Sequence, residues 1–226
     1  SINKNILFFS SEIKALTHHP NFKKEIANES LNNYFFYGYV PAPQSIYSKT
    51  YKVEPSTIKT INMENFQIHS SNFWKIKENK EEEGIFNSSN DIKLKAKDLL
   101  KHSVKEQLIS DVPLGCFLSG GIDSSLISAI AQEFSSNKLQ TFSIGFENNF
   151  FDESNYSNKI AKILGTDHHD IQLTNKDLSN VAIDLADIYC EPFSDSSQLP
   201  TLLLSKFAKE HVKVCLSGDG GGEMFL

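Results

Sequence analysis

Residues 112–125 read VPLGCFLSGGIDSS, in which an apolar run is followed by two glycines and by the start of the segment SSLISAIAQEF. The apolar run predicts a buried strand, and the segment after the glycines predicts a helix. Glycine lets the backbone turn tightly and approach a ligand without a side-chain clash. The stretch therefore predicts a strand, a tight turn and a helix, the unit that parallel α/β sheets repeat.

The same alternation continues along the rest of the chain. Short apolar runs alternating with helical ones predict a parallel, doubly wound sheet with helices on both faces. Ligands bind such sheets at the carboxyl ends of the strands, where two glycine-rich loops, 118–125 and 217–221, are expected. The expected strands are 112–118, 140–145, 168–173 and 212–216, and the expected helices are 91–109, 124–135, 153–164, 175–189 and 198–210.

The amino-terminal part is less regular. Residues 6–10 predict a short strand, and residues 11–16 predict the first turn of a helix capped by Ser10 or Ser11. Further on, the sequence predicts a helical stretch with an aromatic end, then short strands or a winding surface arm, then a charged linker, at 31–39, 44–77 and 77–91 respectively.

Composition argues against several classes of protein. The 226 residues are 39% hydrophobic and 22% charged, as in an ordinary globular protein. A formal net charge of -6 argues against a nucleic-acid partner, because no basic field attracts phosphate backbones. The apolar runs fall short of the ~18 residues that a membrane span needs, so we expect no membrane partner.

The cysteines indicate a cellular location, and the two ends of the chain indicate whether it is a fragment. Cys116, Cys190 and Cys215 are widely spaced, which favours buried, reduced thiols and a cytoplasmic location. The chain has no initial Met and stops inside an apolar segment, so we expect a fragment that is cut short at both ends.

The loop at 119–125 has the composition of a pyrophosphate site. Its glycines, its serine hydroxyls and the free amides of the following helix all favour an anion. Asp123 repels phosphate but is a suitable ligand for Mg²⁺ that bridges phosphates. The alternative is a polar turn capped by Ser124. This is not the Walker pattern, because no Gly-Lys-Ser/Thr follows.

The loop resembles that of the ATP-pyrophosphatase group, whose members split ATP into AMP and pyrophosphate. Within that group, the chain is similar to glutamine-dependent asparagine synthetases over nearly its whole length. Upstream, FSSEIKAL (9–16) and YGYVP (37–41) resemble the exit from that family's glutaminase domain and the bridge beyond it. The other stretches that carry the likeness are SDVPLGCFLSGGIDSS (110–125), TFSIGF (141–146), FDES (151–154), LGTDHH (164–169), EPFSDSS (191–197) with LPT (199–201), and VKVCLSGDGG (212–221).

The resemblance implies a fold and a division into domains. The implied fold is a parallel doubly wound sheet of the ATP-pyrophosphatase (adenine nucleotide alpha hydrolase-like) type, preceded by the tail of a class II glutaminase domain. The implied domains are an amidotransferase remnant at 1–22, a bridging segment and linker at 23–90, and an incomplete ATP-binding asparagine synthetase domain at 91–226.

The resemblance also implies roles for individual residues. Asp219 corresponds to an acidic position that the family uses in forming the acyl-adenylate, and Asp123 to a Mg²⁺ ligand. A second aspartate that binds Mg²⁺-pyrophosphate in the family is replaced by Gly222, and the effect of that replacement stays open. The implied ATP contacts are Leu118, Ile144, Ser217 and Gly218, with the pyrophosphate on Ser119, Gly120, Gly121, Asp123, Ser124 and Ser125.

Some of these positions have a purely structural interpretation. Leu118 and Ile144 are equally residues of a strand core, and Ser217 of a turn. His168 and His169 invite a metal interpretation, but neighbours on a strand point to opposite faces, so we interpret both as structural. Asp184 and Asp187 are expected on a solvated helix face.

The reaction implied by the resemblance is the ATP-dependent amidation of aspartate. The aspartate side chain attacks the α-phosphorus of Mg-ATP, β-aspartyl-AMP and pyrophosphate form, and ammonia from glutamine displaces AMP. Three alternatives stay open: another ATP-pyrophosphatase, a paralogue that amidates a different acid, and a catalytically dead nucleotide-binding remnant. The sequence also leaves open the activity of the truncated chain and its oligomeric state, including a homodimer of the intact protein.

Overall fold

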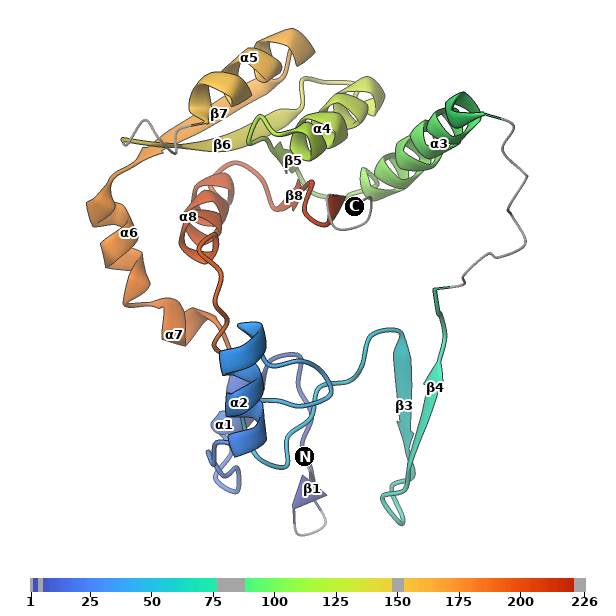
Figure 1. The fold of residues 1–226 in the computed structure, drawn as a ribbon, viewed down its shortest axis with the longest axis vertical. Coiled ribbons are helices and arrows are strands. Elements are labelled where there is room, and N and C mark those ends of the chain that lie inside the picture. Colours follow the sequence, from blue (N-terminus) through green and yellow to red (C-terminus); the bar gives the residue numbers. More distant parts are fainter. Residues whose placement is uncertain (1, 4–5, 77–87, 148–152, 222–226) are drawn as a thin grey trace. The chain divides into compact units, whose positions relative to one another are not determined.

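A computed structural model describes residues 2–3, 6–76, 88–147 and 153–221. The chain forms two compact units (Figure 1). The amino-terminal unit comprises Ser1–Glu81 together with Ile183–Ser196, and the sheet unit comprises Glu82–Ala182 together with Ser197–Leu226.

The sheet unit contains four parallel strands in the order β7-β6-β5-β8. The chain adds β6 and then β7 on one side of β5, and it returns to add β8 on the other side. This reversal makes the crevice between β5 and β8 the place where a doubly wound sheet binds its ligand. The four predicted strands are confirmed as β5 Leu114–Phe117, β6 Gln140–Phe146, β7 Asp167–Leu173 and β8 Val214–Leu216.

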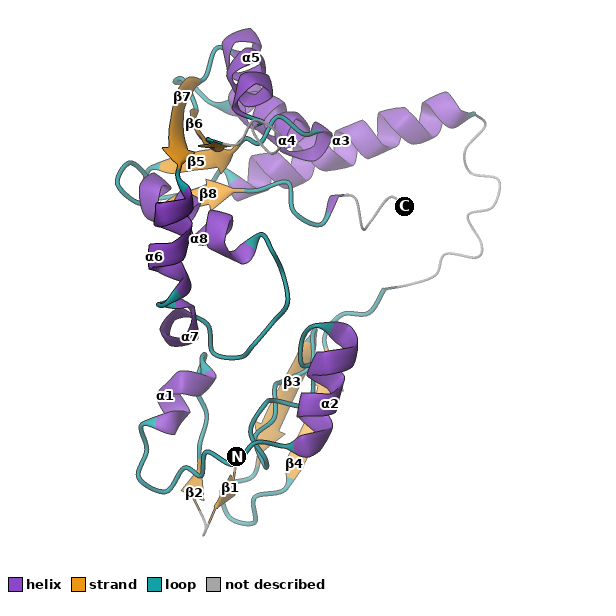
Figure 2. Cartoon of the chain, turned by 60° about the vertical axis from the view of Figure 1, so that its left-hand side comes forward, coloured by secondary structure: helices purple, strands orange, loops and turns teal. Residues whose placement is uncertain are grey.

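Helices cover both faces of this sheet (Figure 2), as the alternation predicts. On one face, Val104 of α3, Cys116 of β5 and Ile130 of α4 share a buried apolar cluster. On the other face, Phe142 of β6 packs with Ala208 of α8. The helices of the sheet unit are α3 Ser89–Gln107, α4 Ile122–Phe134, α5 Ser154–Leu164, α6 Asn175–Ala182 and α8 Gln198–Ala208.

The prediction of a single helix over 175–189 was wrong. Helix α6 ends at Ala182, and a separate short helix, α7 Leu185–Ile188, follows. The chain passes from the sheet unit to the amino-terminal unit at residue 183. No proline or glycine marks this break, so tertiary packing ends the helix where local periodicity does not. The solvated face expected for Asp184 and Asp187 is confirmed, since both residues are exposed.

The cysteines are free thiols. Cys116 is fully buried between the sheet and α4, and burial raises the pKa of its thiol to about 12. Burial also raises the pKa of Cys215, which is partly exposed, to about 11. Thiols in these surroundings stay protonated near neutral pH and make poor nucleophiles.

The amino-terminal unit is built of short elements. Helix α1 begins without the predicted cap: the residue before it is Glu12, whose side chain bonds none of its amides, and the Ser10 hydroxyl donates to the Glu12 carbonyl instead. Helix α2 ends at Gly38, whose φ of 79° is the left-handed conformation that glycine allows. Its elements are β1 Ile2–Asn3, β2 Ile6–Leu7, α1 Ile13–Thr17, α2 Asn28–Tyr37, β3 Thr57–Ile61 and β4 Ile68–Asn72.

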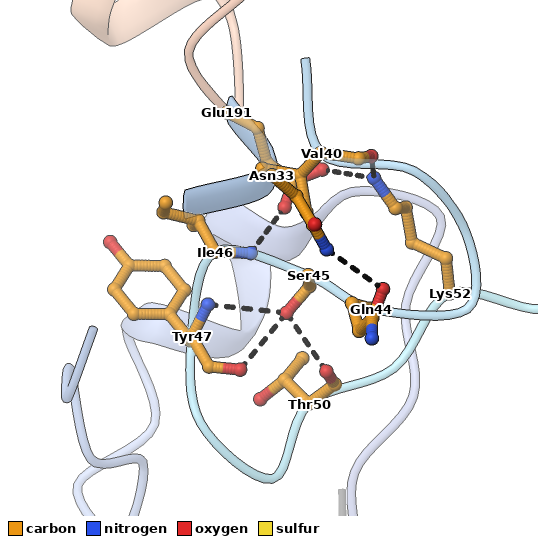
Figure 3. Close-up of polar contacts among 9 residues, drawn as sticks. All are labelled: Asn33, Val40, Gln44, Ser45, Ile46, Tyr47, Thr50, Lys52 and Glu191. Carbon is orange, nitrogen blue, oxygen red and sulfur yellow. Dashed lines mark hydrogen bonds and ion pairs between the residues drawn. The ribbon is translucent and has the colours of Figure 1, made fainter. Parts of the chain in front are cut away.

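A half-buried ion pair fixes the 183–196 segment within this unit (Figure 3). The Glu191 carboxylate accepts one hydrogen bond from Lys52 Nζ at 2.6 Å and another from the Ile46 amide at 2.6 Å. Lys52 Nζ also donates to the Val40 carbonyl at 2.5 Å. Both carboxylate oxygens and the ammonium are therefore satisfied, which is the condition under which a desolvated pair is stable.

No helix in the described part of the chain is long and apolar enough to cross a membrane.

Candidate functional site

A cavity of about 350 Å³ opens where β5, β6 and β8 of the sheet unit reach their carboxyl ends. This volume lies within the range of small-molecule sites, roughly 300–1,000 Å³. Its walls come from the two glycine-rich loops, from β6 and from the first residues of α5 and α8. The lining residues are Phe117, Leu118, Ser119, Gly121, Ile122, Asp123, Ser124, Phe142, Ser143, Ile144, Phe146, Glu153, Thr201, Leu204, Ser217, Gly218 and Asp219.

The first loop leaves helix amides free toward this cavity. Gly121 is the residue that begins α4, and no side chain caps the helix there. Ser124 does not cap it either, because its hydroxyl closes the loop: it accepts from the Ser119 amide at 3.2 Å and lies 2.9 Å from the Ser119 hydroxyl. The first turn of α4 therefore presents unpaired N–H groups and the positive end of the helix dipole to the cavity.

The second loop packs directly against the first. A Cβ atom on Gly218 would lie 2.6 Å from the Ser124 amide nitrogen, so only glycine permits this approach. A Cβ atom on Gly221 would lie 2.7 Å from Asp123 Cγ. Within the loop, the Asp219 amide donates to the Ser217 hydroxyl at 2.9 Å. Two backbone segments thus form one cradle around the carboxyl ends of β5 and β8.

Toward β6 the lining is more apolar, although Ser143, Glu153 and Thr201 also contribute to it. Ile144 and Phe146 face the cavity from the strand, and Leu204 faces it from α8. The cavity therefore has a polar end of backbone amides and hydroxyls, and an apolar end of aliphatic and aromatic side chains. A nucleotide has the same division between its phosphates and its base.

The charge of the cavity suits an anion only together with a cation. Asp123, Glu153 and Asp219 line it, and none of its described lining residues is Lys or Arg. Polyphosphate would be repelled by these carboxylates unless a divalent metal ion lay between them. Asp123 lies in the first turn of α4, beside the free amides. This position suits a Mg²⁺ ligand, since Mg²⁺ takes few protein carboxylates and fills the rest of its coordination with phosphate and water. Among the described residues no cluster of three or more metal-ligating side chains is present.

The structure brings most of the predicted site residues together. Gly120 and Ser125 do not line the cavity. Gly120 has a φ of 90° and packs against the backbone of Ser157, and the buried Ser125 hydroxyl has no hydrogen-bond partner. Gly222 lies outside the described residues. The predicted residues that do line the cavity are Leu118, Ser119, Gly121, Asp123, Ser124, Ile144, Ser217, Gly218 and Asp219.

Sequence reasoning missed part of the wall. Glu153 belongs to the FDES stretch and begins α5, while Thr201 and Leu204 come from α8, far along the chain. The sequence could have indicated Glu153 as a lining residue, since it follows β6 at the carboxyl edge of the sheet, where ligands bind. Thr201 belongs to the LPT stretch that carries the family likeness, but Leu204 had no signal, because only the tertiary fold brings α8 to this edge.

His168 and His169 do not share a metal ion. The His168 ring nitrogens lie 2.9 Å from the Thr141 hydroxyl and 3.2 Å from the Ser143 hydroxyl, and burial lowers the pKa of His168. The His169 ring stacks on Phe142 with 5.3 Å between ring centroids, on the opposite face of the sheet. Both side chains have structural partners, as predicted.

Comparison with known proteins gives family matches that cover most of the chain. Residues 95–226 match the family Asparagine synthase, and residues 1–74 match the family Glutamine amidotransferase domain. A putative glutamine-hydrolyzing asparagine synthetase 2 from Methanocaldococcus jannaschii is 37% identical over 224 residues, which are 98% of this chain and 42% of that protein. The glutamine-hydrolyzing asparagine synthetase 1 of Bacillus subtilis is 32% identical over 228 residues, 100% of this chain and 34% of that protein. The chain thus spans less than half the length of these relatives.

Among solved structures, an NH3-dependent NAD synthetase from Campylobacter jejuni aligns with a TM-score of 0.43 and 14% identity, over 59% of each chain. The family match is independent of this likeness. It covers more than half of the chain and includes both loops of the cavity. The chain therefore belongs to the asparagine synthase family.

Proposed function

We propose that this chain is part of a glutamine-dependent asparagine synthetase, a ligase that forms a carbon–nitrogen bond, and that its cavity binds ATP. In this reaction the side-chain carboxylate of aspartate attacks the α-phosphorus of ATP, and β-aspartyl-AMP and pyrophosphate form. Ammonia from glutamine then attacks the acyl carbon, and AMP leaves. The adenylate is needed because a free carboxylate is a poor acyl donor until one oxygen belongs to a good leaving group.

The observation that carries this proposal is the cradle formed by two backbone segments at the switch point of the sheet. The uncapped first turn of α4 supplies N–H groups, and Gly218 lets the second loop approach them closely. Groups fixed in this way stabilise negative charge that gathers on departing pyrophosphate without having to reorganise.

Each residue of the site has a proposed role. Ser119 to Ser125, which include Gly120 and Gly121, hold the pyrophosphate, while Leu118, Ile144, Ser217 and Gly218 contact the rest of ATP. Asp219, in the second loop, takes part in forming the acyl-adenylate. Asp123 would hold Mg²⁺, which supplies charge neutralisation at the phosphates when bound.

The wider context is proposed on the same basis. We assign residues 1–22 to the end of an amidotransferase domain, 23–90 to a bridge and linker, and 91–226 to the synthetase domain, in a cytoplasmic protein. The proposed substrates are ATP, aspartate, and glutamine or ammonia. We also propose a homodimer for the intact protein.

The test is aspartate-dependent formation of AMP. The protein that contains this chain is supplied with ATP, Mg²⁺, aspartate and ammonia, and AMP, pyrophosphate and asparagine are measured. We expect the three products in equal amounts. Asp219→Asn should lower the rate about 100-fold, the size expected for one lost electrostatic contact in the transition state, while ATP binding stays. AMP formation that does not depend on aspartate, or that another acid supports better, would contradict the assigned acceptor. ATP binding without any AMP would identify a nucleotide-binding relic.

A further inference from the structure

We infer that Glu153 is a specificity-determining residue of the cavity, and that its carboxylate accepts a hydrogen bond from the nucleoside half of the bound nucleotide. The donor is a ribose hydroxyl or the exocyclic amine of adenine. The inference rests on the proposed binding of ATP and names a contact within the same cavity.

The backbone of Glu153 is fixed beside the first loop. Its carbonyl accepts from the amides of Tyr156 at 2.9 Å and Ser157 at 3.2 Å, which forms the first turn of α5. The buried Ser157 hydroxyl lies 3.1 Å from the Ser143 hydroxyl on β6. A Cβ atom on Gly120 would lie 2.8 Å from the Ser157 nitrogen, so the loop and α5 are in direct contact. The start of α5 is therefore tied to both β6 and the first loop.

Glu153 at the start of α5 does not cap the helix, which is the usual role of an acidic side chain at this position. A carboxylate there often accepts from the free amides of the first turn. Glu153 begins α5, but its side chain makes no such bond. Glu153 is exposed and lines the cavity instead, and no hydrogen bond or ion pair of its carboxylate is found among the described residues. The carboxylate is available to a ligand.

The order of the strands decides which half of a nucleotide Glu153 faces. The two loops that hold phosphate follow β5 and β8, whereas Glu153 follows β6, on the other side of β5. The apolar residues Ile144 and Phe146 of β6 lie on this same side. The base and sugar of a nucleotide whose phosphates occupy the two loops extend over β6, and Glu153 stands at the edge of that region.

The chemistry of a carboxylate restricts its partner further. An ionised carboxylate accepts hydrogen bonds and donates none. Beside phosphate it would be repulsive, but a ribose hydroxyl and the adenine amine are both donors. A guanine base places a carbonyl oxygen where adenine has its amine, and that oxygen would repel Glu153. The two possible donors share one chemistry, and nucleotide analogues that lack one of them distinguish between the two.

The experiment is a set of binding titrations with ATP, 2′-deoxy-ATP, 3′-deoxy-ATP and purine riboside triphosphate, which lacks the amine. Wild-type protein should bind one analogue about 10- to 100-fold more weakly than ATP, the loss expected for a hydrogen bond to a charged group. Glu153→Ala should bind ATP as weakly as wild type binds that analogue, and should no longer distinguish the two. Glu153→Gln, which keeps an oxygen acceptor, should retain part of the discrimination. Glu147→Gln, an exposed acidic position outside the cavity wall, is the matched control.

Pyrophosphate serves as the folding control, since its affinity should be the same in wild type and Glu153→Ala. If wild type binds all three analogues as tightly as ATP, or if Glu153→Ala keeps the wild-type discrimination, the inference is overturned while the ATP site stands. If wild type binds no ATP, the proposed function and this inference are both wrong.

Discussion

Gly218 is the residue whose role follows most directly from geometry. A methyl group at this position would lie 2.6 Å from the Ser124 nitrogen and 2.8 Å from the Asp123 carbonyl carbon. Both neighbours are backbone atoms, so neither can rotate away as a flexible side chain would. The two loops can therefore keep their mutual distance only if position 218 has no side chain.

Gly218→Ala is expected to separate the loops and weaken ATP binding by about 5- to 150-fold, since inserting a methyl group into a packed contact typically costs about 1–3 kcal/mol. The matched control is Gly165→Ala at the end of α5. A Cβ atom there meets nothing within 4 Å, although its φ of 72° makes the substitution strained. The control should lose stability but keep its affinity for ATP. Calorimetric titration distinguishes the two, and equal affinities of Gly218→Ala and wild type would show that the loops do not act as one cradle.

At the scale of the elements, a chain of polar side chains joins β6, β7 and α5. His168 of β7 contacts Thr141 and Ser143 of β6, and Ser143 contacts Ser157 of α5. Thr141, Ser143 and Ser157 are buried, so each hydrogen bond replaces water that these groups have lost. The network fixes α5 to the sheet, and with it the start of α5 at the cavity.

This network predicts a dependence of stability on pH. Burial lowers the pKa of His168 below its ordinary value of 6.5, with Asp170 opposing and His169 adding to the shift. Above pH 6.5 the residue is neutral in both states and its contribution is complete. As the pH falls below 6.5, the unfolded chain binds a proton more readily than the folded chain, so stability is lost down to the lower folded pKa.

The measurement is the free energy of unfolding between pH 5 and 8 (about the range in which histidine titrates) for wild type, His168→Gln and His102→Gln. His102 is exposed on α3 and serves as the control. The His168 variant should lose less stability on acidification than wild type, and the His102 variant should follow wild type. Parallel curves for wild type and His168→Gln would show that His168 does not titrate as described.

The elements also show how far sequence can predict this structure. Strands β5 and β8 and the loop after β5 were predictable because buried strands are apolar runs and glycines mark the turns. The break between α6 and α7 was not, because it is set where the chain passes between units. Glu153 was missed for a related reason: it lies some residues beyond β6, and the contacts of Ser157 that place it at the cavity are tertiary.

At the scale of the whole molecule, the chain combines a unit built on a four-stranded parallel sheet with a unit built of short elements. The sheet unit contains the cavity, and the amino-terminal unit includes the segment 183–196 held by Glu191 and Lys52. The family matches divide the chain similarly, at 1–74 and 95–226. The domain boundaries at residues 22 and 90 remain our proposal. Gly222, where the resemblance implies an aspartate, lies outside the described residues.

The central claim is that the cavity between β5 and β8 binds the phosphates of ATP through the α4 loop together with a metal ion on Asp123. The most direct test is calorimetric titration of ATP, with and without Mg²⁺, into wild type, Asp123→Asn and Asp111→Asn, an exposed carboxylate outside the cavity wall. We predict binding that pyrophosphate competes away, a loss of about 10- to 100-fold in Asp123→Asn only when Mg²⁺ is present, and no change in Asp111→Asn. Equal affinity of Mg-ATP for all three proteins, or ATP binding that pyrophosphate does not displace, would contradict the claim.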